Sequence, residues 1–403
     1  MRLLSVLGLL LCACAHAQHT GHAQSSGPAR VELASSATFD AQGVLWAVHK
    51  IGGHVMLRRS ADAGKSWSAP KPVNAAPEGI GAEGDARPKI AAGTRGELYV
   101  TWTKPLAKPY TGEIRFARSL DGGASFSVPI TVHADRQEIT HRFDALTVTR
   151  DGKLFVAWID KRDMDAAGKE GKYRGAAVYF AVSDDRGASF RGDYKLADYS
   201  CECCRIGLLP RDDGSVLALW RHVFEPNVRD HALGVMYADG RAGTVWRATF
   251  DEWAVDICPH HGPSLAADER GRLHAVWFTQ GAKRSGVFYG RLRMNGQSGE
   301  PGVDGLRPVG DDTAAHADVA VSGSTVVVAW KAFDGTRSRL RAMVSADGGN
   351  TWRERDLRTT SGASDQPRML RHGARLFAFW HTQLEGFTVT PVTPVTPLTT
   401  VMP

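Results

Sequence analysis

Four cysteines and two histidines gather in two short segments of the chain, and these residue types either bind soft metals or form disulfides. Residues 201–205 read CECCR, and residues 257–264 read ICPHHGPS. Thiolate and imidazole groups are ligands for copper(I) and zinc, although this spacing matches no standard zinc module. In an oxidising compartment, the same even number of cysteines would pair as disulfides. Both interpretations stay open, and the candidate metal ligands are Cys203, Cys204, Cys258, His260 and His261.

A second group of candidate site residues consists of arginines and aspartates. They lie at the expected starts of strands or in the loops between strands. A guanidinium group binds a carboxylate through two parallel hydrogen bonds, so this set favours an acidic ligand. Its members are Arg87, Arg142, Asp144, Asp163, Arg205, Arg221, Arg229 and Arg368. Single residues of this kind are often structural, but their concentration at one end of a fold would indicate a binding or catalytic site.

A short strand that ends in tryptophan recurs along the chain and would position these residues. A turn residue precedes a run of β-forming apolar residues, as in Gly152 to Trp158 (GKLFVAW). The repeated tryptophans stand 50 to 62 residues apart and are Trp102, Trp158, Trp220, Trp277, Trp330 and Trp380. A seventh copy, Gly43 to His49, has histidine at that position. Self-similarity at this period predicts a propeller, a solenoid or an array.

We predict an all-β fold, a β-propeller with seven four-stranded blades. The 43 glycines among 403 residues and the lack of long helical periodicity agree with it. The last repeat offers only three strands, at Arg368–Arg371, Leu376–His381 and Phe387–Val392. We therefore expect residues 29–34 to close the ring as the outer strand of that blade, because an open sheet edge is a liability. Six blades are the alternative if the last repeat packs differently.

Four repeats carry a second motif, S-x-D-x-G-x-[ST]-[WF], between their third and fourth strands. The copies are Ser60–Trp67, Ser119–Phe126, Ser183–Phe190 and Ser345–Trp352. The aspartate can accept hydrogen bonds from backbone N–H groups and the glycine allows positive φ, so the motif predicts a tight turn. Because neighbouring strands are antiparallel, these turns should lie at the rim opposite the starts of the inner strands. CECCR and ICPHHGPS would then face each other at the central mouth, between blades four and five.

This motif resembles the Asp-box (BNR) repeat of the sialidase-like β-propellers, over residues 35–380. The Cys/His segments also resemble those of uncharacterised exported bacterial members of that family. A sialidase implies three arginines that hold the substrate carboxylate, a tyrosine nucleophile assisted by a glutamate, and an aspartic acid/base. The candidate catalytic residues are then Arg142, Asp144, Arg205 and Arg221, and the candidate binding residues are Arg87, Asp163, Arg229 and Arg368. The chain departs from the family at residues 35–39, where SSATF replaces the Arg-Ile-Pro motif, and no Tyr/Glu pair identifies itself.

The N-terminus predicts export. Residues 1–17 resemble a signal peptide, with an apolar run and Ala15-His16-Ala17 before the cleavage point. We expect a periplasmic or secreted protein with a flexible leader at 18–28, the propeller at 29–392 and a Pro/Thr tail at 393–403. In the alternative, Leu11-Cys12-Ala13-Cys14 is a lipobox, Cys14 is acylated, and the protein is an outer-membrane lipoprotein.

The charge pattern narrows the class of partner. The net charge is +6 with both signs mixed throughout, and no basic run carries interleaved aromatic residues, which disfavours nucleic acid. Three hypotheses follow. The first is a propeller that binds a small molecule or glycan at the mouth beside the Cys/His cluster. The second is a glycoside hydrolase of the exo-sialidase type acting on acidic sugars, and the third is a periplasmic copper- or zinc-binding protein.

Overall fold

The computed structural model describes residues 31–168, 175–257, 259–294 and 302–392. The predicted signal peptide, leader and tail lie outside these residues and remain predictions. Within the described ranges, the residues from Glu32 onward form one compact unit. The described residues contain 27 strands and one short helix, α1 (Arg162–Ala167). No helix among them is long and apolar enough to cross a lipid bilayer.

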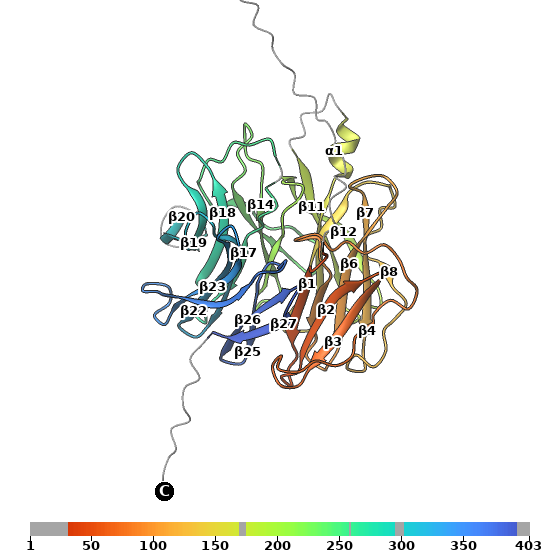
Figure 1. The fold of residues 1–403 in the computed structure, drawn as a ribbon. Helices are drawn as coiled ribbons and strands as arrows, with labels where there is room; N and C mark the ends of the chain where they lie inside the picture. The colour runs from red at the N-terminus through yellow and green to blue at the C-terminus, as the bar shows by residue number, and fades with distance from the viewer. Residues whose placement is uncertain (1–30, 169–174, 258, 295–301, 393–403) are drawn as a thin grey trace, which may run out of the picture. The chain divides into compact units, whose positions relative to one another are not determined.

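The strands form seven antiparallel sheets, and each sheet is built from strands consecutive in the chain (Figure 1). Blade one comprises β1 (Ser35–Phe39), β2 (Leu45–Ile51), β3 (His54–Ser60) and β4 (Lys71–Pro72). Blade two comprises β5 (Lys89–Ala92), β6 (Leu98–Pro105), β7 (Gly112–Ser119) and β8 (Ile130–Thr131). Blade three comprises β9 (His141–Val148), β10 (Leu154–Asp160), β11 (Ala176–Ser183) and β12 (Arg191–Ser200). Blade four comprises β13 (Gly207–Pro210), β14 (Val216–Arg221), β15 (His231–Met236) and β16 (Trp246–Arg247).

The remaining blades follow the same order. Blade five comprises β17 (Ser264–Ala267), β18 (Leu273–Gln280), β19 (Ser285–Arg293) and β20 (Gly302–Pro308). Blade six comprises β21 (Ala315–Ser322), β22 (Thr325–Phe333), β23 (Ser338–Ser345) and β24 (Arg353–Thr360). Blade seven comprises β25 (Arg368–His372), β26 (Arg375–Thr382) and β27 (Gly386–Pro391).

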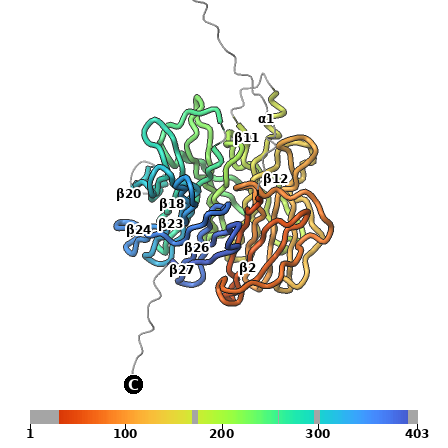
Figure 2. Tube along the Cα trace, in the orientation of Figure 1, coloured from red at the N-terminus to blue at the C-terminus, as the bar shows by residue number. Residues whose placement is uncertain are grey.

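The first strand of each blade is the innermost, and these seven strands close a ring. In order β1, β5, β9, β13, β17, β21 and β25, each contacts the next, and β25 contacts β1. Figures 1 and 2 show the last blade in blue beside the first in red and orange. The predicted seven-bladed propeller is therefore confirmed, including the three strands of the last repeat.

The ring closes differently from our expectation for residues 29–34. Of that segment, residues 31–34 are described, and none of them is in a strand. Closure instead comes from packing of blade one against blade seven, where the Phe39 and Phe377 rings lie 5.2 Å apart. The backbone N–H of Ser35 also donates to Asp365 Oδ2 at 3.0 Å. Contacts between blades one and seven thus stand where we predicted an outer β-ladder.

The recurring tryptophans are buried between neighbouring blades, which explains why a strand with this ending repeats. All six rank among the largest fully buried side chains among the described residues. Trp102 packs with residues of blades one and two, and Trp158 with residues of blades two and three. An aromatic ring of this size fills the space between two twisted sheets and removes a large apolar area from water.

The four S-x-D-x-G turns share one hydrogen-bond pattern. In the first, the backbone N–H of Ser66 donates to Asp62 Oδ1 at 2.9 Å, and that of Gly64 donates to Ser60 Oγ at 2.7 Å. The other three repeat these bonds around Asp121, Asp185 and Asp347. They join third to fourth strands, so they lie at the rim opposite the starts of the inner strands. We call the rim where the inner strands begin the upper rim.

Candidate functional site

Charged side chains from four blades meet at the upper rim, and we call this group the hub. The antiparallel order of the blades requires this meeting, because every inner strand begins at the same end. The hub comprises Asp85, Arg87, Lys89, Asp144, Arg205, Asp365 and Arg368. Four of these seven residues were predicted as site residues from the sequence. The other four predicted members of the Arg/Asp set, Arg142, Asp163, Arg221 and Arg229, are not part of the hub.

Asp85 is the centre of the charge network in the hub. Its carboxylate accepts hydrogen bonds from Arg368 Nη2 at 3.1 Å and from the backbone N–H of Arg205 at 3.3 Å. Burial acts to raise the pKa of Asp85, but the Arg205 and Arg87 guanidinium groups hold it below its usual range. One ionised carboxylate therefore links blades two, four and seven.

Arg87 is fully buried and takes part in ring closure. Its Nη1 donates to Asp365 Oδ2 at 2.6 Å and to the carbonyl oxygen of Ser35 at 2.8 Å. Its Nε and Nη2 have no acceptor among the described residues. The positive charge of Arg87 is thus neutralised by Asp365.

Lys89 and Asp144 lie side by side in the hub. Asp144 Oδ2 accepts a hydrogen bond from Thr101 Oγ1 at 2.6 Å. Lys89 Nζ donates to two backbone carbonyls of the segment before it, at 2.9 and 2.6 Å. Burial lowers the pKa of Lys89, and the nearby Asp144 carboxylate opposes that shift. Sequence reasoning missed Lys89, although its place two residues after Arg87, at the start of an inner strand, could have revealed it.

The Arg205 guanidinium is held rigidly and acts on the Asp85 charge, but it forms no ion pair with a carboxylate of the described residues. Nε donates to the carbonyl of Pro263 at 2.8 Å, and Nη2 donates to the carbonyls of Gly262 at 3.2 Å and Ala317 at 2.9 Å. Nη1 is buried and finds no acceptor among the described residues. The described part of the chain also places no acidic group within ion-pair distance of this guanidinium. Arg205 therefore presents a fixed positive charge with one unused donor.

Arg221 and Arg142 also lack ion pairs within the described ranges. Arg221 Nη2 donates to the carbonyls of His261 at 3.0 Å and Phe278 at 2.7 Å. The Arg142 guanidinium lies over the ring of Phe143, 5.1 Å from its centre. Burial lowers the pKa of Arg142, and the charge of Glu83 only partly opposes that shift.

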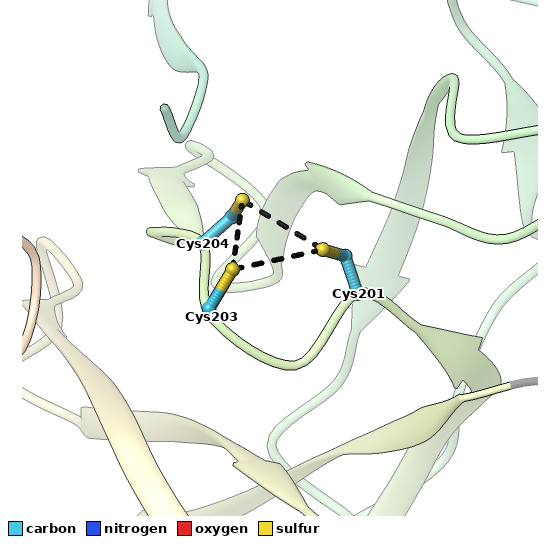
Figure 3. Close-up of side chains that lie close together, drawn as sticks. All are labelled: Cys201, Cys203 and Cys204. Carbon is cyan, nitrogen blue, oxygen red and sulfur yellow. Dashed lines mark hydrogen bonds between the residues drawn. The ribbon is translucent and has the colours of Figure 1, made fainter. Parts of the chain in front are cut away.

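Three cysteines form a compact buried group beside the hub, which we call the thiol triangle. The sulfur atoms of Cys201, Cys203 and Cys204 lie 3.9 Å apart along each side, with all three pointing inward (Figure 3). This distance is nearly twice a disulfide bond, so no two of these three sulfurs are bonded to each other. Contact with Cys201 raises the pKa of Cys204. The sequence-predicted ligand set included Cys203 and Cys204 but left out Cys201.

The histidines of that predicted ligand set have other surroundings. The ring of His261 stacks on that of His316, with centres 4.2 Å apart, and on that of Phe278. Burial lowers the pKa of His261 to about 4 and that of His316 to about 3, so both are neutral at physiological pH. His260 is exposed. Neither His260 nor His261 belongs to the compact thiol group within the described ranges, and Cys258 lies outside the described residues.

Two predicted binding residues lie away from the hub. Asp163, on α1, accepts a hydrogen bond from the Tyr179 hydroxyl at 2.8 Å and pairs with Lys195 Nζ at 3.0 Å. Arg229 Nη1 instead donates to Cys201 Sγ at 3.4 Å. The structure thus groups Arg87, Asp144, Arg205 and Arg368 in the hub, but places Asp163 and Arg229 in other environments.

Comparison with known proteins supports the architecture. No protein-family model matches the chain, and no curated protein sequence matches it. Among solved structures, it resembles a PL25 ulvan lyase bound to -[GlcA(1-4)Rha3S]-, with 10% identity, a TM-score of 0.51, and coverage of 88% of this chain and 92% of the other. It also resembles the polysaccharide lyase Uly1, with 13% identity, a TM-score of 0.51, and coverage of 88% of each chain. These likenesses show the fold.

Proposed function

We propose that this protein is an exported propeller that binds an acidic carbohydrate at its hub. The observation that carries the proposal is the Arg205 guanidinium. Three backbone carbonyls fix its orientation, and one buried N–H has no acceptor in the described part of the chain. A buried donor of this kind costs free energy until an acceptor reaches it, and a carboxylate or sulfate would supply both the acceptor and the opposite charge.

The surrounding charges favour the same class of ligand. Lys89 lies near Asp144, and Arg368 donates a hydrogen bond to Asp85. The hub can therefore bind an anionic group of a sugar through its basic side chains and sugar hydroxyl groups through its carboxylates. The ulvan lyase of similar fold binds a glucuronate-containing sugar. By analogy, we propose an acidic polysaccharide as the class of substrate or ligand for this chain. The hub, rather than the opposite rim with its four tight turns, supplies the polar groups that such a ligand needs.

Calorimetric titration with defined oligosaccharides tests the proposal. The panel contains uronate-bearing and sulfated oligosaccharides, an α-linked sialoside, and neutral arabinan oligosaccharides as the uncharged comparison. We expect acidic members to bind, and Arg205→Ala to weaken that binding by about 10- to 100-fold, the value of one charge-assisted hydrogen bond. Arg353→Ala, at an exposed position that begins β24, is the matched control and should leave binding unchanged. Equal binding of neutral sugars, or an unaffected Arg205→Ala variant, would refute the proposal.

The same panel separates binding from cleavage. A hydrolase of the exo-sialidase type would release a free sugar and a new reducing end, whereas a binding protein would leave the oligosaccharide intact. Mass spectrometry of the oligosaccharides after incubation detects either result. Loss of turnover in Asp144→Asn, with binding kept, would assign the acid role to Asp144.

The export part of the proposal rests on residues 1–17. Expression of the full chain with its own N-terminus, followed by mass measurement of the mature protein, tests it. A mass that begins at Gln18 supports the signal peptide, and a diacylated species that begins at Cys14 supports the lipoprotein. An uncleaved chain in the cytoplasm would refute both.

A further inference from the structure

The shape of the thiol triangle matches the coordination sphere of one metal ion. The three sulfur–sulfur distances are all 3.9 Å, so the triangle is equilateral. Its centre lies about 2.3 Å from each sulfur, which is the length of a metal–thiolate bond.

The local chain explains how three sulfurs reach one point. Cys201, Cys203 and Cys204 lie in the short connection between β12 and β13, which has turns but no strand pairing. The intervening Glu202 points elsewhere, because its carboxylate pairs with Lys161 Nζ. All three cysteines are less than 5% exposed. They belong to an apolar cluster that includes Phe143, Ile206 and Trp220, which shields the triangle from water.

The charges around the triangle favour an anionic ligand set. Arg229 Nη1 donates to Cys201 Sγ at 3.4 Å. Arg142 lies within charge-interaction range of Cys203, and Arg221 lies within that range of Cys204. One guanidinium therefore contacts a sulfur and two others act on the remaining sulfurs through their charge, so three cations can offset three thiolates. A monovalent metal leaves less excess positive charge in this apolar interior than a divalent metal does.

We propose that Cys201, Cys203 and Cys204 bind one copper(I) ion in a planar, three-coordinate site at the start of blade four. Soft thiolates select copper(I), whereas structural zinc takes four ligands. The three thiol protons pass to solvent as the sulfurs bind the ion, with no change of oxidation state. The site is independent of the proposed carbohydrate function, since none of the three sulfurs belongs to the hub.

Anaerobic titration of the mature chain with copper(I), against a chromophoric copper(I) chelator, tests the site. We expect one copper(I) per chain, and X-ray absorption should show three sulfur neighbours at about 2.3 Å. Replacing any one of the three cysteines by serine should weaken copper(I) binding by more than roughly 100-fold. This exceeds the effect expected when a residue that only hydrogen-bonds to a metal ligand is lost. The variants are Cys201→Ser, Cys203→Ser and Cys204→Ser. Glu202→Gln, inside the same loop, is the matched control and should bind as the wild type does.

A second measurement keeps the proposal testable if a serine variant fails to fold. Copper(I) should protect all three cysteines of the wild-type protein from alkylation, as read by peptide mass mapping. Absence of binding, protection of other positions only, or unchanged affinity in the serine variants would overturn the site. Preference for zinc over copper(I) in direct competition, with a fourth ligand in the absorption spectrum, would overturn the three-coordinate copper assignment.

Discussion

Arg87 Nη1 lies 2.6 Å from Asp365 Oδ2, and this buried ion pair joins blade two to blade seven across 278 residues of sequence. Asp365 also accepts a hydrogen bond from the backbone N–H of Ser35. Its carboxylate, which precedes blade seven, therefore contacts both blade one and blade two where the ring closes. The strand that we expected to close the ring is not present among residues 31–34. The polar seam and the aromatic contacts of Phe39 therefore take its place.

The first prediction concerns this seam. Asp365→Asn leaves the Arg87 cation buried without its counter-charge, so we expect the free energy of unfolding to fall by about 3 to 5 kcal/mol. Urea denaturation followed by tryptophan fluorescence measures it. Glu32→Gln, which removes a partly exposed partner of Lys50, is the comparison and should cost at most about 1 kcal/mol. Equal losses in the two variants would mean that the seam pair does not hold the ring.

The second prediction uses His49, which replaces the recurring tryptophan in blade one. Burial, aided by His381 and Arg58, lowers the pKa of His49 to about 4. Above pH 6.5, the His49 imidazole is neutral in both the folded and the unfolded protein. Between pH 6.5 and 4, only the unfolded chain binds a proton at His49. Stability should therefore fall by roughly 2 to 3 kcal/mol over that interval.

His49→Phe isolates this effect, because His381 is present in both proteins. Urea denaturation at pH 7.5 and 4.5 should give a smaller difference in unfolding free energy for His49→Phe than for the wild type. An identical pH dependence in the two proteins would show that His49 does not resist protonation in the folded state.

The third prediction concerns the acid sensitivity of the tight turns. Burial acts to raise the pKa of Asp185, but hydrogen bonds from Ser189 and Ser183 together outweigh it and lower that pKa to about 2. The stabilisation is complete above the ordinary value of 3.8 and is lost as the pH falls toward 2. Because the turn is exposed to solvent, we expect an effect below about 1 kcal/mol. Unfolding free energies at pH 5 and 3 should differ less in Asp185→Asn than in the wild type, and Asp184→Asn should behave as the wild type does.

The fourth prediction compares alanine substitutions at two glycines that have the same backbone conformation. One substitution introduces backbone strain alone, and the other introduces the same strain together with a steric clash. Gly64 has φ of +89° and Gly96 has φ of +88°. A methyl group on Gly64 would lie 2.3 Å from Val389 Cγ2 of blade seven, whereas one on Gly96 would meet open space. Gly96→Ala should cost about 1 kcal/mol from strain alone, and Gly64→Ala should cost about 1 to 3 kcal/mol more. Thermal and urea unfolding would contradict the clash if both variants lost the same amount.

The sequence by itself determined the fold and the rim on which the polar residues gather. Local signals suffice for this: the strand that ends in Trp158 repeats at a nearly constant period, and each antiparallel blade must begin at the same end. The expectation that Arg87, Asp144, Arg205 and Arg368 lie at one rim followed from that order, but the same order also predicted Asp163 and Arg229, which lie outside the hub. The tight turns around Asp62 and its counterparts were also predictable, since their hydrogen bonds span only four residues.

Only the tertiary structure decided which partners these groups have. Whether Arg87 meets Asp365 or a ligand depends on contacts between residues 278 positions apart, which no local pattern encodes. The same holds for Lys89, whose neighbour Asp144 comes from the next blade, and for the 3.9 Å triangle that includes Cys201. Sequence spacing sets the order of side chains along a strand, whereas distances between loops depend on how seven twisted sheets pack around one axis.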